Sequence, residues 1–228
     1  MKHSGKARKA ALSLILWTLV ALVVIFFAGF IATIVGTLIS AISASLIILW
    51  AVFVIFTLYF FRDPNARVPL ASGLIVSPAH GKVDIIDQFN EPLFIGGPCQ
   101  RVSIFLSVFN VHVQNAPVGG KLVFYKYTTG QFLNALNTES AAHNENALLG
   151  FEVAERPGVK IGVRLIAGLI ARRIVPFAAE GDEMQRGERI SLIQFGSRVD
   201  LYLPLTAKIK VKIGDRVVGG ETIMATFE

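Results

Sequence analysis

The stretch that decides the fold of the polar part of the chain is GDEMQRGERI, residues 181–190. It recurs 33 positions later as GDRVVGGETI, residues 214–223, and both copies read Gly-Asp, four residues, Gly-Glu, one residue, Ile. Glycine permits a positive φ in a tight turn, and aspartate tends to bond the neighbouring backbone. A short apolar strand pattern follows each copy. The pair therefore predicts a β structure built from two related halves.

The segments around this repeat alternate with period two, which is typical of half-buried strands. Residues 102–108, 121–127 and 198–203 show it, as does KIKVKI at 208–213. Only residues 132–147 suggest a helix. We expect a mainly β domain with few short helices over residues 62–228. The repeat is similar to that of lipoyl/biotinyl-type barrel-sandwich domains, but the chain lacks their Met-Lys-Met site, so it predicts the architecture and not a carrier function.

A block without charges precedes this domain. Residues 10–61 contain no Asp, Glu, Lys or Arg, and all 16 acidic residues lie beyond position 62. Because a helix needs about 20 residues to cross a bilayer core of about 30 Å, the block is too long for one span. We expect a transmembrane helical hairpin over residues 11–61, with spans near 11–33 and 38–60 and a turn around Gly36. A re-entrant hairpin in one leaflet is the alternative.

Basic residues flank the apolar block on both sides. A tail of residues 1–10 contains Lys2, Lys6, Arg8 and Lys9, and Arg62 and Arg67 follow the block. The positive-inside rule then places both ends of a hairpin in the cytoplasm, with the polar domain on the cytoplasmic side of the cell membrane. Most of the net charge of +6 lies in the tail, which argues against nucleic acid as a partner and for anionic lipid.

Several motifs occur in order along the polar domain. They are FRDP at 61–64, SPAHGKV at 77–83, FLSVFNVH at 105–112 running on to Ala-Pro at 116–117, and residues 173–201, which contain RISLIQFGSRVDL at 189–201. A Gly-Ser pair alone is a common turn, and these surroundings are what make Gly196-Ser197 specific. From about residue 59 to its end, the chain resembles the phosphatidylserine decarboxylase family in its short, compact prokaryotic form.

The resemblance implies that the chain cuts itself between Gly196 and Ser197. Ser197 would attack the carbonyl of Gly196, and elimination and hydrolysis would turn the serine into a pyruvoyl group. This group would head a new α chain, residues 197–228, that stays associated with the β chain, residues 1–196. The resemblance implies that this self-made pyruvoyl group is the cofactor and that no metal is needed, and the absence of His and Cys ligand spacing agrees with this. The implied reaction converts phosphatidylserine of the membrane into phosphatidylethanolamine.

A serine hydroxyl is a weak nucleophile without a nearby base. His112, in the run Val-His-Val, matches the family's catalytic histidine and is expected to orient or deprotonate Ser197. His80 stands where the family commonly has an aspartate that completes an Asp-His-Ser triad, so the triad in its usual form is in doubt. Three outcomes are open: His80 itself acts as the base, Asp84 or Asp87 supplies the carboxylate, or self-cleavage is slow or absent. We favour the first two together.

Three cations are candidates for the lipid phosphate: Lys82, Arg101 and Arg198. The sequence does not rank them. His143 lies in a polar stretch that the family uses near its substrate, where simple solvation is the competing interpretation. Two other functions stay open, namely decarboxylation of archaetidylserine, the ether-lipid analogue, and a non-catalytic membrane-anchored barrel-sandwich adaptor. Association into a homo-oligomer is compatible with the sequence.

Overall fold

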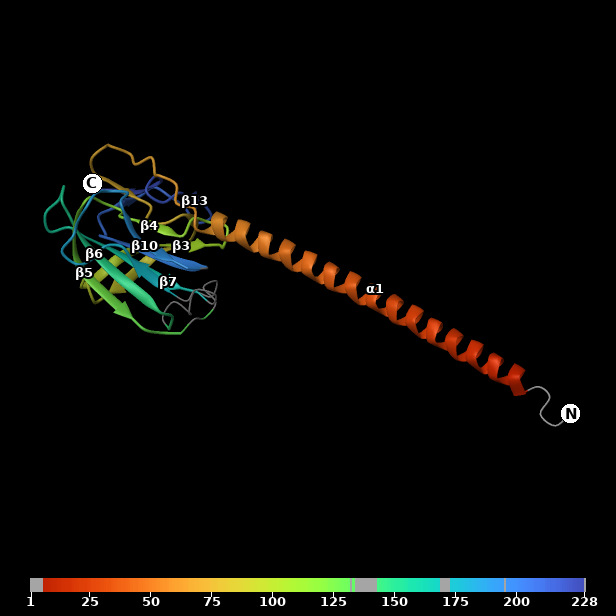
Figure 1. The fold of residues 1–228 in the computed structure, drawn as a ribbon. Helices are drawn as coiled ribbons and strands as arrows, with labels where there is room; N and C mark the ends of the chain where they lie inside the picture. Colours follow the sequence, from red (N-terminus) through yellow and green to blue (C-terminus); the bar gives the residue numbers. More distant parts are fainter. Residues whose placement is uncertain (1–5, 132, 134–142, 169–172, 195, 228) are drawn as a thin grey trace. The chain divides into compact units, whose positions relative to one another are not determined.

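The chain forms two compact units, Met1–Thr57 and Leu58–Glu228. A computed structural model describes residues 6–131, 133, 143–168, 173–194 and 196–227 (Figure 1). The first unit is helical. In the second, the described regular elements are β-strands, apart from the last turn of the helix.

A single helix, α1 (Lys6–Phe60), makes up the described part of the first unit and ends in the second. Its segment Ile15–Phe60, 46 residues with a mean hydropathy of 2.8, is long and apolar enough to cross a membrane. Hydroxyl groups along it bond to carbonyls of the preceding turn, as Thr33 Oγ1 does with Phe30 O at 2.7 Å. Such bonds satisfy polar side chains in an apolar surrounding. The helix is therefore consistent with membrane anchoring.

The structure differs from the predicted hairpin, because α1 has no turn around Gly36. The helix continues between the two expected spans, and Ser40 Oγ donates to Gly36 O at 2.9 Å. The physical reason is that residues 6–60 contain no proline, and a glycine costs a helix interior only about 1 kcal/mol. A straight helix of 46 residues is about 69 Å long, roughly twice the thickness of a bilayer core.

The second unit contains one large sheet and two small ones, whose strand pairings are antiparallel. The large sheet, in spatial order, comprises β13 (Arg216–Val217), β2 (Gly81–Glu91), β3 (Gly97–Leu106), β11 (Ser197–Leu203), β7 (Lys160–Ala167), β6 (Asn146–Val153), β5 (Gly120–Thr128) and β9 (Glu183–Met184). One small sheet comprises β1 (Leu74–Val76), β14 (Ile223–Thr226) and β12 (Lys208–Ile209), and the other β4 (Val113–Asn115), β10 (Arg189–Ile193) and β8 (Ile174–Pro176). Buried apolar side chains from all three sheets form one core.

The prediction of a mainly β domain is confirmed, and the large sheet curls into a half-barrel (Figure 1). Residues 208–213 are an exception, since β12 covers only two of them, Lys210 N adds one bond to Met224 O at 2.8 Å, and the chain then turns where Asp215 Oδ2 accepts from Lys212 N at 3.0 Å. Of the helix expected at 132–147, residues 132 and 134–142 lie outside the described residues, and Asn146 begins β6. The closer likeness to barrel-sandwich domains stays a prediction.

The internal repeat has a structural counterpart, because the order of the large sheet reads alike from both ends. In one half, Gly181 N donates to Leu122 O at 2.7 Å and Leu122 N to Asp182 O at 2.9 Å. In the other half, Gly214 N donates to Val83 O at 2.8 Å and Val83 N to Asp215 O at 2.9 Å. The two Gly-Asp copies therefore make the same backbone contacts, each with its own half of the sheet.

A second repeat, which the sequence analysis missed, supplies the other side of these contacts. Residues 77–83 (SPAHGKV) correspond to residues 116–122 (APVGGKL), 39 positions later. The strands that start in them, β2 and β5, pair with β13 and β9 respectively. Within this correspondence His80 is equivalent to Gly119 and Lys82 to Lys121. The two halves thus share the same backbone arrangement but differ in some side chains, such as His80 and its counterpart Gly119.

We expect Gly120→Ala to destabilise the domain by about 1–3 kcal/mol or more. A Cβ at Gly120 would collide with the carbonyl oxygen of Glu152 and lie 3.0 Å from Ala154 N, both backbone atoms held in the sheet. The matched control is Gly97→Ala, where a Cβ would meet nothing within 4 Å. Thermal unfolding of the full chain in detergent measures the difference, and equal midpoints for the two variants would contradict the close approach of β5 and β6.

Candidate active site

Ser197 opens β11, which lies in the large sheet between β3 and β7. Its Cα partners are Leu106 and Ala167, and its side chain shares the core-facing register of Val199. The residue is fully buried, and its Oγ has no hydrogen-bond partner among the described residues. An unpaired buried hydroxyl costs about 1–3 kcal/mol, so stability alone does not account for a serine here.

The backbone of Gly196 is held on both sides of its Cα. Its φ of +69° lies in the left-handed region, while a Cβ there would meet nothing within 4 Å, so conformation and not space favours glycine. Gly196 O accepts a hydrogen bond from Gly168 N at 3.1 Å. Gly196 N donates to His112 Nε2 at 3.2 Å. The carbonyl that Ser197 would attack is therefore polarised by a backbone N–H.

His112 is fully buried, and both of its ring nitrogens are engaged. Because Nε2 accepts from Gly196 N, Nδ1 carries the proton and donates to Asn110 O at 3.0 Å. Burial lowers the pKa of His112 to about 4, with smaller contributions from the charge of Arg62 and from His80, against the bond to Asn110. The Phe60 ring, 4.4 Å from the imidazole, is part of that burial. His112 is thus a neutral base of fixed tautomer, and in this state it binds the backbone of Gly196.

The two aspartates considered for the triad are bound to arginines. Asp84 makes a bidentate pair with the buried Arg198, at 3.0 and 2.6 Å. Asp87 makes another with Arg101, in which Oδ1 lies 2.9 Å from Nε. The acceptor that orients His112 is instead the Asn110 carbonyl. Arg101 and Arg198 are two of the three candidate phosphate ligands, and in these pairs each already binds a carboxylate.

His80 is half-buried beside a different set of charges. Burial is the main cause that lowers its pKa, the charge of Arg62 adds to this, and Glu221 opposes it. Glu221 is the glutamate of the second Gly-Glu copy, and the sequence analysis did not single it out. The electrostatic influence of His80 on His112 places the two histidines in one neighbourhood.

A cavity of about 600 Å³ opens beside His80 and beside Asn110 and Val111, which precede His112. It is lined by Arg62, His80, Gly81, Lys82, Phe105, Ser107, Phe109, Asn110, Val111, Arg216, Val217 and Val218. Lys82 is the one candidate phosphate ligand from the sequence that lines it, and Arg62 and Arg216 add two cations that the sequence did not indicate as ligands. His143 is exposed and does not belong to this lining.

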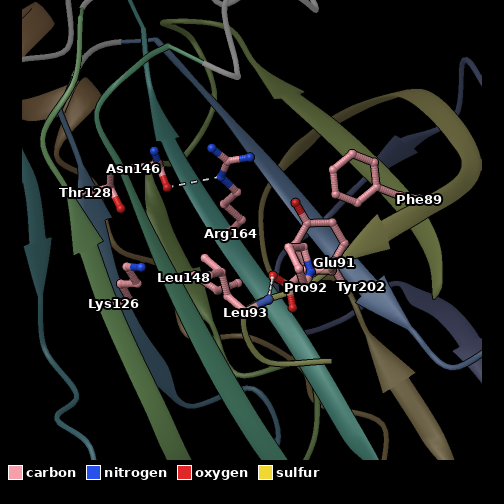
Figure 2. Close-up of a pocket in the computed structure, with 10 residues that line it drawn as sticks. All are labelled: Phe89, Glu91, Pro92, Leu93, Lys126, Thr128, Asn146, Leu148, Arg164 and Tyr202. Atoms are coloured by element: carbon pink, nitrogen blue, oxygen red, sulfur yellow. Dashed lines mark hydrogen bonds between the residues drawn. The ribbon is translucent and has the colours of Figure 1, made fainter. Parts of the chain in front are cut away.

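A second cavity, of about 300 Å³, contains none of the predicted site residues in its lining (Figure 2). Figure 2 shows Arg164 directed toward Asn146, with Nε 3.1 Å from Oδ1. The carboxylate of Glu91 caps the neighbouring loop by accepting from the backbone N–H groups of residues 93–95. Nothing in the described part of the chain groups three His, Cys, Asp or Glu side chains as a metal site would require.

Comparison with known proteins gives matches over most of the chain. The sequence model of the phosphatidylserine decarboxylase family matches residues 53–225. A phosphatidylserine decarboxylase proenzyme of Desulfotalea psychrophila is 44% identical over 200 residues, covering 87% of this chain and 92% of that protein. A proenzyme of the same name from Symbiobacterium thermophilum is 41% identical over 196 residues, with 83% and 90% covered.

The chain belongs to the phosphatidylserine decarboxylase family. This confirms the family resemblance found in the sequence and the prediction of a decarboxylase made as a proenzyme. A third relative, from Ruegeria pomeroyi, is 42% identical over 199 residues, with 83% of this chain and 90% of that protein covered. The match of the family spans the whole β domain up to residue 225, so it includes both halves of the repeat.

We expect His112 to stay neutral down to about pH 5 and to take up a proton near pH 4. Because its pKa is depressed in the fold, the unfolded chain binds a proton first, and the free energy of unfolding falls as the pH drops from about 6.5 toward 4. NMR of imidazole-labelled full chain in detergent, assigned with His112→Gln, measures the titration. A midpoint near 6.5 would show that His112 is solvated and not in the buried contact described.

Proposed function

We propose that the chain decarboxylates phosphatidylserine to phosphatidylethanolamine with a pyruvoyl group that it makes from Ser197. The observation that carries this proposal is the arrangement around the Gly196–Ser197 bond. A buried hydroxyl without a partner among the described residues directly follows a glycine whose carbonyl accepts from Gly168 N. The neutral imidazole of His112 lies on the same glycine. This arrangement is suited to the formation of a pyruvoyl group from Ser197.

The cleavage begins with attack of Ser197 Oγ on the carbonyl carbon of Gly196. The C–N bond breaks as the C–O bond forms, which turns the peptide into an ester, and Gly168 N–H stabilises the charge that develops on Gly196 O. β-Elimination then releases the carboxylate of Gly196 and leaves dehydroalanine at position 197. Water replaces the nitrogen, ammonia leaves, and a keto group is left at the new chain end. This group supplies an electron sink for decarboxylation.

We assign the proton transfer in cleavage to His112. Its Nε2 is unprotonated at neutral pH and accepts from Gly196 N. To accept the proton of the Ser197 hydroxyl, the imidazole must exchange this hydrogen bond for one to that hydroxyl. The Asn110 carbonyl holds Nδ1–H in the way that a triad carboxylate would. Asp84 and Asp87 are held by arginines, so we do not assign them this task. His80, which lines the cavity, is proposed to handle protons during turnover.

The two chains produced by cleavage are proposed to stay together. β11 lies between β3 and β7 and pairs along its length with both. Downstream, β14 pairs with β1 and β13 with β2. The segment Ser197–Glu228 therefore contributes strands to two sheets, and separating it would expose much of the core.

We further propose that α1 keeps the β domain at the membrane surface, on the cytoplasmic side. Arg62 and Arg67 follow the apolar segment directly, and basic residues next to a span favour the cytoplasm. A diacyl substrate stays in the bilayer, so an anchored active site meets it at a higher effective concentration. The names of the relatives favour the serine phospholipid over its ether analogue and over an adaptor role.

On a denaturing gel, the purified full chain should appear as two fragments, the smaller being Ser197–Glu228 with a blocked N-terminus. Ser197→Ala removes the nucleophile and should abolish both cleavage and decarboxylation. Ser103→Ala is the matched control, because Ser103 is also a fully buried serine of the large sheet, on the neighbouring strand β3. Intact-mass spectrometry reads out both variants, and a native chain that stays uncut would favour the adaptor.

Gly196→Ala should slow cleavage by roughly tenfold or more while costing only about 1–2 kcal/mol of stability. An alanine disfavours the left-handed conformation that aligns Gly196 with Gly168 and His112. Gly96→Ala is the control, since Gly96 also has a positive φ, +81°, and open space at its Cβ. A time course of cleavage and a thermal melt separate the effects. If both variants cleave at the wild-type rate, the backbone geometry of Gly196 plays no part in maturation.

A further inference from the structure

Two cations face each other across the edge of the large sheet. Lys82 and Arg216 are direct Cα partners in the pairing of β2 with β13, and both line the 600 Å³ cavity. Like charges directly opposite each other destabilise a sheet. No described carboxylate lies within ion-pair distance of either side chain. Both side chains are exposed, so water weakens their repulsion, and an anion between them would offset it further.

The other half of the fold provides an internal comparison. Lys121 is the repeat counterpart of Lys82, and its partner across the sheet is Glu183, the counterpart of Arg216. The same backbone position thus carries an opposite-charge pair in one half and a like-charge pair in the other. Since the shared fold is compatible with the complementary pair, it does not require two cations. The half that contains His80 is the one with an arginine, Arg216, at the position where the other half has Glu183.

The surroundings of the pair strengthen its positive field. Neither Asp nor Glu occurs among the described residues that line the cavity, and Arg62 is a third cation there. The Arg62 guanidinium is fixed by bonds of 2.7 Å to the carbonyls of Tyr59 and Phe109, which orient it and leave its charge in place. Ser107 and Asn110 add polar groups to the wall. This wall is suited to an anion with several oxygen acceptors.

We propose that Lys82 and Arg216 bind the phosphodiester of the lipid headgroup, an assignment that rests on the proposed function. The substrate also carries a carboxylate, but a cation bound there would stabilise the ground state that decarboxylation destroys. The phosphodiester keeps its charge throughout the reaction. Its phosphorus lies four bonds from the headgroup amine, about 5 Å, so anchoring it at the pair holds the amine within the same cavity.

Arg216→Glu tests the assignment, because it gives this half the charges of the other half. The variant should fold and cut itself like the wild type. Its KM for a soluble short-chain phosphatidylserine should rise about tenfold or more, while kcat changes less than about twofold. Glu183→Arg is the matched control: it creates a like-charge pair with Lys121, lowers stability slightly, and should leave KM unchanged. An unchanged KM in Arg216→Glu would overturn the proposal.

Competition with soluble headgroups identifies the anion. Glycerophosphoserine, glycerophosphoethanolamine and inorganic phosphate should all inhibit the wild type, and all should lose potency in Arg216→Glu. A loss confined to glycerophosphoserine would mean that the pair binds the carboxylate, and a loss confined to inorganic phosphate would mean a free-phosphate site, so either result overturns the phosphodiester assignment. A wild type that neither cuts itself nor decarboxylates would instead refute the proposed function.

Discussion

The hydrogen bond from Gly196 N to His112 Nε2 is the contact on which the rest of the site depends. It joins the start of β11 in the large sheet to the segment that enters β4 in a small sheet, so the core between the sheets fixes its geometry. It exists only if the imidazole is neutral, and burial ensures this by lowering the pKa of His112 to about 4. It also requires the left-handed conformation at Gly196. The maturation chemistry proposed above is therefore tied to the packing of the domain.

The internal symmetry separates what the fold needs from what the site needs. Both halves keep the Gly-Asp turns, because these serve the backbone arrangement, and both have a lysine at the start of the long strand. Where one half has Gly119 and Glu183, the other has His80 and Arg216. Each difference places a cationic or titratable side chain on the cavity. The duplicated framework thus carries different side chains at equivalent positions in its two halves.

The sequence predicted the parts of the site that lie in contiguous motifs. Gly196, Ser197 and His112 were singled out in this way, and their roles stay predictions, whereas the Gly-Asp repeat indicated the two-half architecture. The Asn110 carbonyl was not predictable, because any residue can provide a backbone acceptor. Arg216 acquires its role only from its partner across the sheet. The second repeat was detectable, but Pro, Gly and Lys are too few matches in seven residues to stand out without the pairing.

The apolar segment shows a different limit. Its length and lack of charge predicted membrane association, but the turn at Gly36 was inferred from the thickness of a bilayer and not from a helix-breaking residue. A chain without proline in this segment keeps its helical hydrogen bonds, as the bond from Ser40 to the Gly36 carbonyl illustrates. The length of a span constrains where a helix fits in a membrane, whereas local sequence decides whether it breaks.

The positive field of the cavity would link the proposed maturation to the proposed turnover. Burial is the main cause that lowers the pKa of both His80 and His112, and the charge of Arg62 adds to it, which suits a base that must activate a hydroxyl. A phosphodiester bound at Lys82 and Arg216 would oppose that field. The part of the pKa depression that comes from Arg62 would then weaken, while the part that comes from burial would stay. Binding of the headgroup would thereby make it easier for a histidine of the site to take up a proton and to deliver it during turnover.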